Sequence, residues 1–242
     1  MNLVIDAGNT AVKLAVFDKE KLLSQEVWAY NEVLSALEFL FKTHPDISHI
    51  LLSAVGPWHF NLEQWLPESC TLVQLDESTK LPFQLVYDTP ETLGKDRIAL
   101  AAAAISSYPG TNVLVIDAGT CITYDLITDE KEYRGGAISP GLQMRYRALH
   151  EGTARLPILS PEIPEQLIGT STKKSIHSGV VFGITFEIQG VIEQYQSLFP
   201  DLTVILTGGD AQFLSKQLKN TIFAHSNFLL QGLNFLLEHN KN

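Results

Sequence analysis

Two short stretches of this sequence nearly repeat each other: Val4-Ile5-Asp6-Ala7-Gly8-Asn9-Thr10 and, 111 residues later, Val115-Ile116-Asp117-Ala118-Gly119-Thr120. In each copy an apolar run ends in an aspartate, and a glycine two residues later permits a tight turn. An alternating run follows, at residues 12–17 in the first copy and 122–127 in the second, which is typical of a β-hairpin. The offset is close to half of the 242 residues, so the sequence predicts two similar halves.

Each half continues with further elements. An apolar run enters a turn of small residues at 50–56 in the first half and at 204–210 in the second, and each indicates a strand. Helical patterns cover residues 31–42, 90–107, 171–198 and 211–218. Pro109-Gly110 ends the second of these patterns just before the repeat begins. We therefore expect an N-terminal lobe of residues 1–111 and a C-terminal lobe of residues 112–242.

The composition is that of an ordinary globular protein, with 45% hydrophobic and 18% charged residues. The apolar runs are far shorter than the roughly 20 residues of a membrane helix, and the N-terminus lacks the pattern of a secretory signal. We expect a cytoplasmic protein without a membrane partner. A net charge of −10 provides no basic surface for nucleic acid, so we expect no nucleic-acid partner either.

The cysteines and histidines indicate neither disulfides nor a zinc site. Cys70 and Cys121 are the two cysteines, and we expect both as reduced, small buried side chains. The seven histidines show none of the spacings that place two metal ligands on one element.

The duplicated hairpin, strand and helix resemble the ribonuclease-H-like lobes of the superfamily that includes acetate and sugar kinases, chaperone ATPases and actin. The resemblance implies an α/β fold of two such lobes, with mixed sheets flanked by helices and with ATP and substrate in the cleft between them. The two turns suit this task, because glycine lets the backbone approach phosphate, threonine donates to phosphate oxygens and aspartate binds Mg²⁺. For a single Asp-x-Gly, a turn without a ligand would be the favoured explanation, and the duplication reverses this in favour of the nucleotide site. The fold alone names no function.

Further motifs resemble the type III pantothenate kinases. Tyr87 and Pro90 precede Leu93-Gly94-Lys95-Asp96-Arg97, which resembles the pantothenate site of that family. Matches to other motifs of the family follow in order at residues 135–141, 148–157, 169–179, 206–210 and 230–233. The resemblance spans nearly the whole chain. It implies ATP-dependent phosphorylation of pantothenate at the start of coenzyme A synthesis, by a homodimer that uses Mg²⁺ and a monovalent cation, K⁺ or NH₄⁺.

The resemblance also implies roles for individual residues. Asp96 would be the catalytic base. The first phosphate loop would comprise Asp6, Ala7, Gly8, Asn9, Thr10, Ala11, Val12 and Lys13, with Asp6 also positioning Mg²⁺, directly or through water. From the second loop Thr120 would contact ATP and Asp117 would bind the monovalent cation. The pantothenate pocket would be lined by Tyr87, Gly94, Lys95, Asp96 and Arg97, and by Thr172 in a pocket shared between two copies of the chain.

Several of these residues also have ordinary structural explanations. Lys13 could be a solvated strand lysine, and Thr172 could be a helix N-cap. Asp96 could offset the dipole of the helix that it begins, while Arg97 pairs on the surface. Lys95 stands where alanine is common in the family, and it places a charge beside the proposed base.

Two other functions stay open at this point. A different kinase or phosphohydrolase of the superfamily would act on a sugar or carboxylate and would show no preference for pantothenate. A non-enzymatic regulator that kept the fold would be expected to have lost Asp6, Asp96 or Asp117, and this sequence retains all three.

Overall fold

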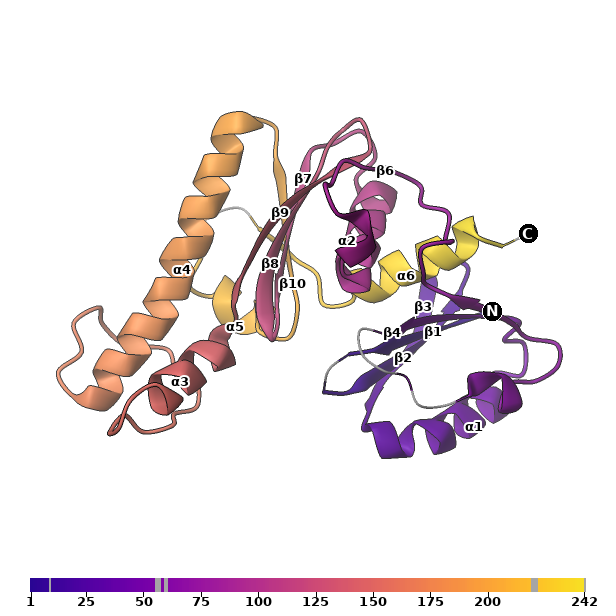
Figure 1. Cartoon of the computed structure of the whole chain (residues 1–242), viewed down its shortest axis with the longest axis horizontal. Coiled ribbons are helices and arrows are strands. Elements are labelled where there is room, and N and C mark those ends of the chain that lie inside the picture. The colour runs from indigo at the N-terminus through magenta and orange to yellow at the C-terminus, as the bar shows by residue number, and fades with distance from the viewer. Residues whose placement is uncertain (9, 55–57, 59–60, 219–221, 242) are drawn as a thin grey trace. The chain divides into compact units, whose positions relative to one another are not determined.

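The computed structural model describes residues 1–8, 10–54, 58, 61–218 and 222–241. The chain divides into two compact units (Figure 1). One comprises Met1–Pro109 and the segment that begins at Asn227, and the other comprises Gly110–Ser226. The sequence predicts two continuous halves, and the structure differs because the last helix packs against elements of the first unit.

The first unit is built on a sheet with strand order β3-β2-β1-β4-β5. The strands of this sheet are β1 (Asn2–Ala7), β2 (Val12–Asp18), β3 (Lys21–Trp28), β4 (His49–Ala54) and β5 (Thr71–Gln74), and the short β6 (Gln84–Leu85) is not part of it. Its helices are α1 (Val33–Thr43), α2 (Lys95–Ser107) and α6 (Phe228–His239), with 3-10 turns at Tyr30–Glu32, Leu62–Gln64 and Pro90–Thr92. Strands β1, β2 and β3 are antiparallel neighbours, whereas β4 runs parallel to both β1 and β5.

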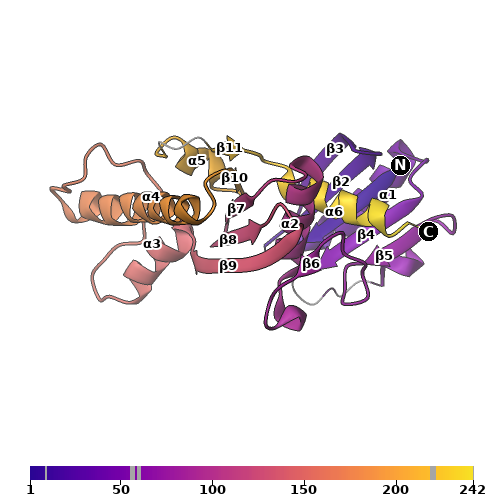
Figure 2. The ribbon, with the colours of Figure 1, turned by 90° about the horizontal axis from the view of Figure 1, so that it is seen from above.

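The two faces of this sheet are covered by different helices. Leu3, Ile5 and Leu52 point to the face where α1 contributes Val33 and Leu37 to a shared core. Helix α6 contacts β1 and β4 from the other side and packs along α2. Figures 1 and 2 show α1 on one side of the sheet and α6 running across the opposite side.

In the second unit the strands follow the same order as β9-β8-β7-β10-β11. Its strands are β7 (Val113–Ala118), β8 (Cys121–Ile127), β9 (Glu132–Pro140), β10 (Thr203–Thr207) and β11 (Phe223–Ala224), and its helices are α3 (Leu142–Glu151), α4 (Thr172–Leu198) and α5 (Ala211–Ser215). Strands β7, β8 and β9 are antiparallel neighbours, and β10 runs parallel to β7 and β11. Each strand therefore has a counterpart in the first unit, and the mixed α/β fold expected from the repeat is confirmed.

The predicted hairpins and helices are found with small differences. β1 and β2 form one hairpin and β7 and β8 the other. The pattern over residues 90–107 divides into a 3-10 turn and α2, because Leu93 and Gly94 adopt extended backbone angles between them. Helix α5 ends at Ser215, earlier than expected. Residues 55–56 of the predicted strand at 50–56 lie outside the described residues.

Helix α6 was not predicted as a helix, and Gly232 at its centre explains why. Glycine costs a helix interior roughly 1 kcal/mol relative to alanine. In the structure a Cβ atom at Gly232 would lie 1.8 Å from the carbonyl oxygen of Ala99 in α2. The glycine thus permits a close approach of two helices, and this contact holds α6 in the first unit.

Helix α4 is long and apolar enough, by length and composition alone, to cross a membrane. Half of its most apolar window is buried inside the structure. Ile184, Ile188 and Ile192 of α4 pack in one core with Leu114 and Ile116 of β7. The helix therefore behaves as a core helix of the second unit.

Candidate functional site

Asp6 lies at the end of β1, opposite Lys13 of β2 in the hairpin register. The residue is only 5% exposed, and its Oδ2 atom lies 3.6 Å from Nζ of Lys13. Burial raises the pKa of the Asp6 carboxyl group, and the negative charge of Asp96 adds to that rise, whereas Lys13 opposes it. The structure therefore brings Asp6, Lys13 and the proposed base close enough to interact within the first unit.

The turn that joins β1 to β2 is held by its own backbone and by a tyrosine. The amide of Gly8 donates to the carbonyl of Ala11 at 3.1 Å. The hydroxyl of Tyr30 donates a short hydrogen bond to the carbonyl of Gly8. Thr10 is exposed at this turn, whereas Asn9 lies outside the described residues. Of the remaining residues expected in this loop, Ala7 and Val12 are buried strand ends that position the turn.

Two residues of this region were missed by sequence reasoning. Tyr30 follows the turn by 22 residues, and no motif connects them. Ser53 is paired with Asp6 in the parallel register of β4 and β1, so both side chains point to the same face of the sheet. Its hydroxyl is buried and has no hydrogen-bond partner in the described part of the chain.

The start of α2 carries the residues expected to bind pantothenate. Gly94 is the N-cap residue, and Asp96 lies in the first turn. An Oδ1 atom of Asp96 accepts from the backbone amide of Arg97 at 2.8 Å. The Arg97 guanidinium, which belongs to a buried residue, lies 5.9 Å from the centre of the Tyr87 ring, within the range of a cation–π contact. Tyr87, Gly94, Asp96 and Arg97 are thus neighbours.

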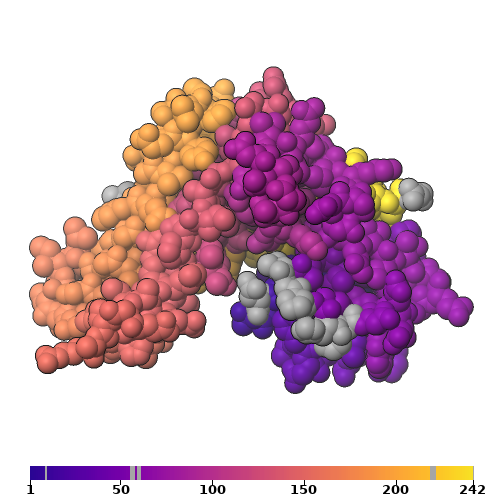
Figure 3. Space-filling model, in the orientation of Figure 1, coloured from indigo at the N-terminus to yellow at the C-terminus, as the bar shows by residue number. Residues whose placement is uncertain are grey.

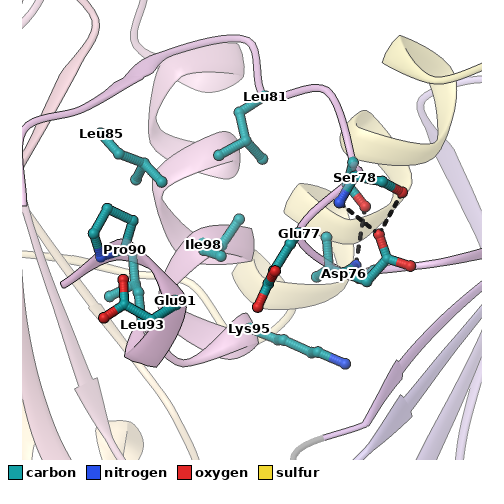
Figure 4. Close-up of a pocket in the computed structure, with 12 residues that line it drawn as sticks. Asp76, Glu77, Ser78, Leu81, Leu85, Pro90, Glu91, Leu93, Lys95 and Ile98 are labelled. Atoms are coloured by element: carbon teal, nitrogen blue, oxygen red, sulfur yellow. Dashed lines mark hydrogen bonds between the residues drawn. The ribbon is translucent and has the colours of Figure 1, made fainter.

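The Lys95 side chain faces a cavity that these neighbours do not line. It lines a cavity of about 740 Å³ together with the apolar residues Leu75, Leu81, Leu85, Pro90, Leu93 and Ile98 and the polar residues Asp76, Glu77, Ser78, Thr79 and Glu91. Figure 4 shows the Lys95 side chain extending along the side of the cavity on which Asp76 lies. Hydrogen bonds from Ser78 lower the pKa of Asp76, and the positive charge of Lys95 contributes. Among the residues expected to contact pantothenate, this cavity is lined by Lys95 alone.

The second turn has a corresponding aspartate at the end of β7. Asp117 pairs in register with Thr207 of β10, and the glycine after Thr207 packs directly upon it. Gly208 has a φ of +95°, and a Cβ atom there would lie 2.3 Å from Oδ1 of Asp117 and 2.4 Å from the carbonyl oxygen of Ala118. Thr120 is exposed at the tip of the turn.

Thr172 is not the N-cap of α4. That position is held by Ser171, whose side chain accepts from the amide of Lys174 at 3.3 Å. Thr172 is instead the first residue of the helix and lines a cavity of about 800 Å³ between α3 and α4, with Arg145, Ala148, Leu149, Leu156, Ser175, Ile176, Gly179 and Val180. The N-cap explanation of this threonine is therefore wrong, and its side chain is exposed.

Among the described residues, no three His, Cys, Asp or Glu side chains form a group that could hold a metal ion by themselves. A Mg²⁺ ion bound to nucleotide phosphates needs only one or two protein carboxylates. Asp6 fits this requirement, because its buried carboxylate also experiences the negative charge of Asp96. Asp117 provides oxygen atoms of the kind that alkali cations bind.

Comparisons with known proteins point to one family. A family model described as type III pantothenate kinase matches residues 2–194. The type III pantothenate kinase of Christiangramia forsetii is 55% identical over 241 residues, covering 100% of this chain and 99% of the relative. That of Bacteroides fragilis is 41% identical over 240 residues, covering 99% and 98%.

Solved structures show the same fold at lower identity. A protein from Campylobacter jejuni described as a conserved putative Baf family transcriptional activator is 22% identical, with a TM-score of 0.64 and 98% coverage of each chain. A glucokinase from an Antarctic psychrotroph is 12% identical, with a TM-score of 0.55 and 99% coverage of each chain. At these identities the similarity concerns the fold.

Proposed function

The chain belongs to the type III pantothenate kinase family, and we propose from this premise how its residues carry out the reaction. It is a kinase that transfers phosphate from ATP to pantothenate in coenzyme A synthesis. A sugar or carboxylate kinase and a non-enzymatic regulator are disfavoured by the 55% identity to a type III pantothenate kinase over the full length of the chain.

Asp96 is the general base of the proposed mechanism. Its carboxylate lies in the first turn of α2, in the space that the absence of a side chain at Gly94 leaves for it, and interacts electrostatically with Asp6. As the terminal hydroxyl of pantothenate attacks the γ-phosphorus of ATP in line, its proton moves to the Asp96 carboxylate and ADP leaves. The phosphoryl group passes directly to the acceptor oxygen, with no phosphorylated enzyme.

Arg97 and Tyr87 orient the substrate. The guanidinium of Arg97 can form two parallel hydrogen bonds with the carboxylate of pantothenate, and its contact with the Tyr87 ring restricts its orientation. Gly94 and Lys95 complete this side of the proposed pocket. Because Lys95 faces the neighbouring cavity, we assign it contact through its backbone or stem.

The two turns are proposed to bind ATP. Backbone amides and the hydroxyls of Thr10 and Thr120 donate to phosphate oxygens, and Lys13 is close enough to Asp6 to act at the same phosphates. Asp6 would hold Mg²⁺, which neutralises phosphate charge when bound. Asp117 would hold K⁺ or NH₄⁺. Chelation of Mg²⁺ should therefore abolish the rate, and replacement of K⁺ by Na⁺ should lower it; an unchanged rate in either assay contradicts the corresponding assignment.

We also propose a cytoplasmic homodimer in which Thr172 of one copy reaches the pantothenate pocket of the other. The support is a set of large apolar side chains exposed in the second unit: Ile158, Leu167, Ile168 and Phe186 are each more than half exposed. Figure 3 shows α4 and the loop before it at an outer surface of the second unit. Burial of such exposed apolar side chains against another protein surface is favourable.

The observation that carries the mechanism is the place of Asp96 beside Gly94, Arg97 and Asp6. The test is an ADP-release assay with pantothenate, glucose and acetate as acceptors. Pantothenate should be the preferred acceptor, and Asp96→Asn should lower kcat by roughly 10²–10⁴-fold while pantothenate still binds. Arg97→Ala should instead weaken pantothenate binding, because a charge-assisted hydrogen bond contributes about 1.5–3 kcal/mol.

The matched control is Asp129→Asn, which makes the same chemical change at an exposed turn of the second unit. It should retain the full rate. If Asp96→Asn turned over within a few-fold of the unmodified enzyme, the role of Asp96 as base would be wrong, and its acceptance of the Arg97 amide would be a purely structural contact.

A further inference from the structure

A network of polar side chains inside the second unit has no part in the mechanism above. An Nη2 atom of Arg145 in α3 lies 2.5 Å from Oε2 of Glu187 in α4. The hydroxyl of Tyr124 in β8 donates to Oε1 of the same glutamate at 2.9 Å. Burial alone would raise the pKa of Glu187, yet hydrogen bonds from Arg145, Ser139 and Tyr124 hold it below its ordinary value. Glu187 is therefore a charged acceptor shared by neighbouring elements.

Arg145 also binds the end of β9. Its Nε atom donates to the carbonyl of Pro140 at 2.9 Å, and its Nη2 atom donates to the hydroxyl of Ser139 at 2.9 Å. The backbone amide of Arg145 donates to the carbonyl of Gly141 at 3.1 Å. One side chain and its own amide thus fix three consecutive residues that lead from β9 into α3.

Gly141, the last of these residues, packs directly on the turn that carries Thr120. Its amide donates to the carbonyl of Thr120 at 3.1 Å. A Cβ atom at Gly141 would lie 2.2 Å from the carbonyl oxygen of Gly119 and 2.4 Å from that of Thr120. The two backbones are in contact without space for a side chain, so a shift of Gly141 must shift the turn.

These contacts form a closed circuit. Tyr124 in β8 binds Glu187, which binds Arg145, and Arg145 binds the end of β9. The chain continues from there to Gly141, which contacts the turn at Thr120, and this turn leads directly into β8 and back to Tyr124. We propose that Arg145, Glu187 and Tyr124 are positioning residues for ATP binding. They hold the turn at Thr120 in the position in which Thr120 contacts the phosphates. This inference rests on the proposed contact of Thr120 with ATP.

Steady-state kinetics of Glu187→Gln and Tyr124→Phe test the inference. Glu187→Gln keeps the shape of the side chain but removes the charge that holds Arg145, and Tyr124→Phe removes a single hydroxyl, so at least this variant should fold. The KM for ATP should rise several-fold in both, while the KM for pantothenate stays within about twofold. Arg145 itself is less informative, because it also lines the cavity that contains Thr172.

The controls are Glu193→Gln in α4 and Arg147→Lys in α3. Glu193 is exposed, and Arg147 has an exposed side chain whose ion-pair partner is Glu151 of the same helix. Both controls should leave each KM unchanged. The melting temperature of every variant is measured in parallel, since a general loss of structure would raise the KM of both substrates.

Thr120→Ala separates the inference from the site on which it rests. If Thr120→Ala raises the KM for ATP but Glu187→Gln and Tyr124→Phe do not, the positioning role is wrong and the site stands. An equal rise in the KM of both substrates also overturns the positioning role. If Thr120→Ala itself has no effect on the KM for ATP, the assignment of Thr120 fails and the inference fails with it.

Discussion

At the scale of single residues, Gly94 controls where the proposed base can lie. A Cβ atom at this position would lie 2.4 Å from Oδ1 of Asp96. Because the obstacle is the end of a short side chain and not backbone, Gly94→Ala should move the carboxylate while the fold survives. A displacement of about 1 Å can cost roughly 10²-fold in rate, so we expect kcat to fall by about 10–100-fold in the ADP-release assay.

Gly190→Ala serves as the control for this substitution. An added methyl group at Gly190 of α4 meets nothing within 4 Å, and its kcat should equal that of the unmodified enzyme. The melting temperature of Gly94→Ala should stay within a few degrees. A full rate in Gly94→Ala would mean that the observed position of the Asp96 carboxylate is not needed for proton transfer.

At Asp6 we expect one substitution to lower the activity and to raise the stability of the protein. Its pKa in the folded protein is raised above the ordinary value of 3.8, chiefly by burial. The folded state therefore favours the protonated carboxyl, and the ionised form present at neutral pH lowers the free energy of unfolding. Asp6→Asn should abolish the kinase rate yet raise the melting temperature at pH 7, by about 2–4 °C for each kcal/mol gained.

The pH dependence gives the check on this explanation. As the pH falls from neutral toward 3.8, the unmodified protein becomes protonated at Asp6, so the difference in melting temperature between it and Asp6→Asn should shrink. The Lys13 partner opposes the burial cost of Asp6, and solvent weakens that opposition because the lysine side chain is 46% exposed. A variant that melts lower than the unmodified protein at pH 7 would contradict the burial cost.

The residues that sequence could identify are those that belong to short motifs. Asp6 and Asp117 were predicted because each ends an apolar run before a glycine, and the structure places both at strand ends. Tyr30 and Ser53 could not be predicted in this way. Their relation to Asp6 and Gly8 depends on a hydrogen bond and a strand register across 22 and 47 residues respectively, and no local pattern records either.

At the scale of elements, the contact of α2 with α6 depends on Gly232. Any side chain there would meet the carbonyl oxygen of Ala99, and its Cβ would also lie 3.1 Å from Cβ of Ala103. Gly232→Ala should therefore separate the helices, at a cost of about 1–3 kcal/mol for overpacking. Chemical denaturation measures this as a lower free energy of unfolding.

Gly190→Ala is also the control for Gly232→Ala, and here the free energy of unfolding should rise. Gly190→Ala adds a methyl group in open space within a helix, and it should stabilise the protein by about 0.5–1 kcal/mol. Equal free energies of unfolding for the two variants would show that α2 and α6 can separate without cost, and the close approach would then not be what holds α6 in the first unit.

Most elements could be predicted because their patterns are local. The hairpins follow from alternating runs around a glycine, and α4 follows from a long apolar pattern that begins at its Ser171 cap. Helix α6 could not, since the reason for Gly232 lies in α2. The Arg145–Glu187 pair is likewise invisible in the sequence, because its two residues are 42 positions apart in different helices.

At the scale of the whole molecule, the duplication predicted from two short, nearly repeated stretches is confirmed by two units with corresponding strand orders. The two units differ in the chain segments that form them. The first carries the segment that begins at Asn227 as an added helix, which a division at residue 111 assigns to the wrong half. The proposed chemical roles also divide: the first unit contains Asp96 and Arg97, and the second contains Thr120 and Thr172.

The separation of Asp96 and Thr172 allows a test of the shared pocket. Asp96→Asn should inactivate a site from one side, and Thr172→Arg should inactivate it from the other by placing a large charged side chain where Thr172 is proposed to reach the pantothenate pocket. Each variant alone should form an inactive dimer.

In a two-fold dimer with shared pockets, a mixed dimer would place both defects in one site and leave the second site intact. Random assembly on co-expression yields mixed dimers for about half of the molecules, and each mixed dimer has one intact site of two, so about a quarter of the normal rate should return.

If each pocket were complete within one chain, every site would carry one defect and the mixture would stay inactive. Sedimentation of the unmodified protein as an active monomer would exclude the shared pocket independently. The mixed-variant rate thus decides between a dimer that merely covers exposed apolar side chains such as Phe186 and one that completes the pantothenate pocket.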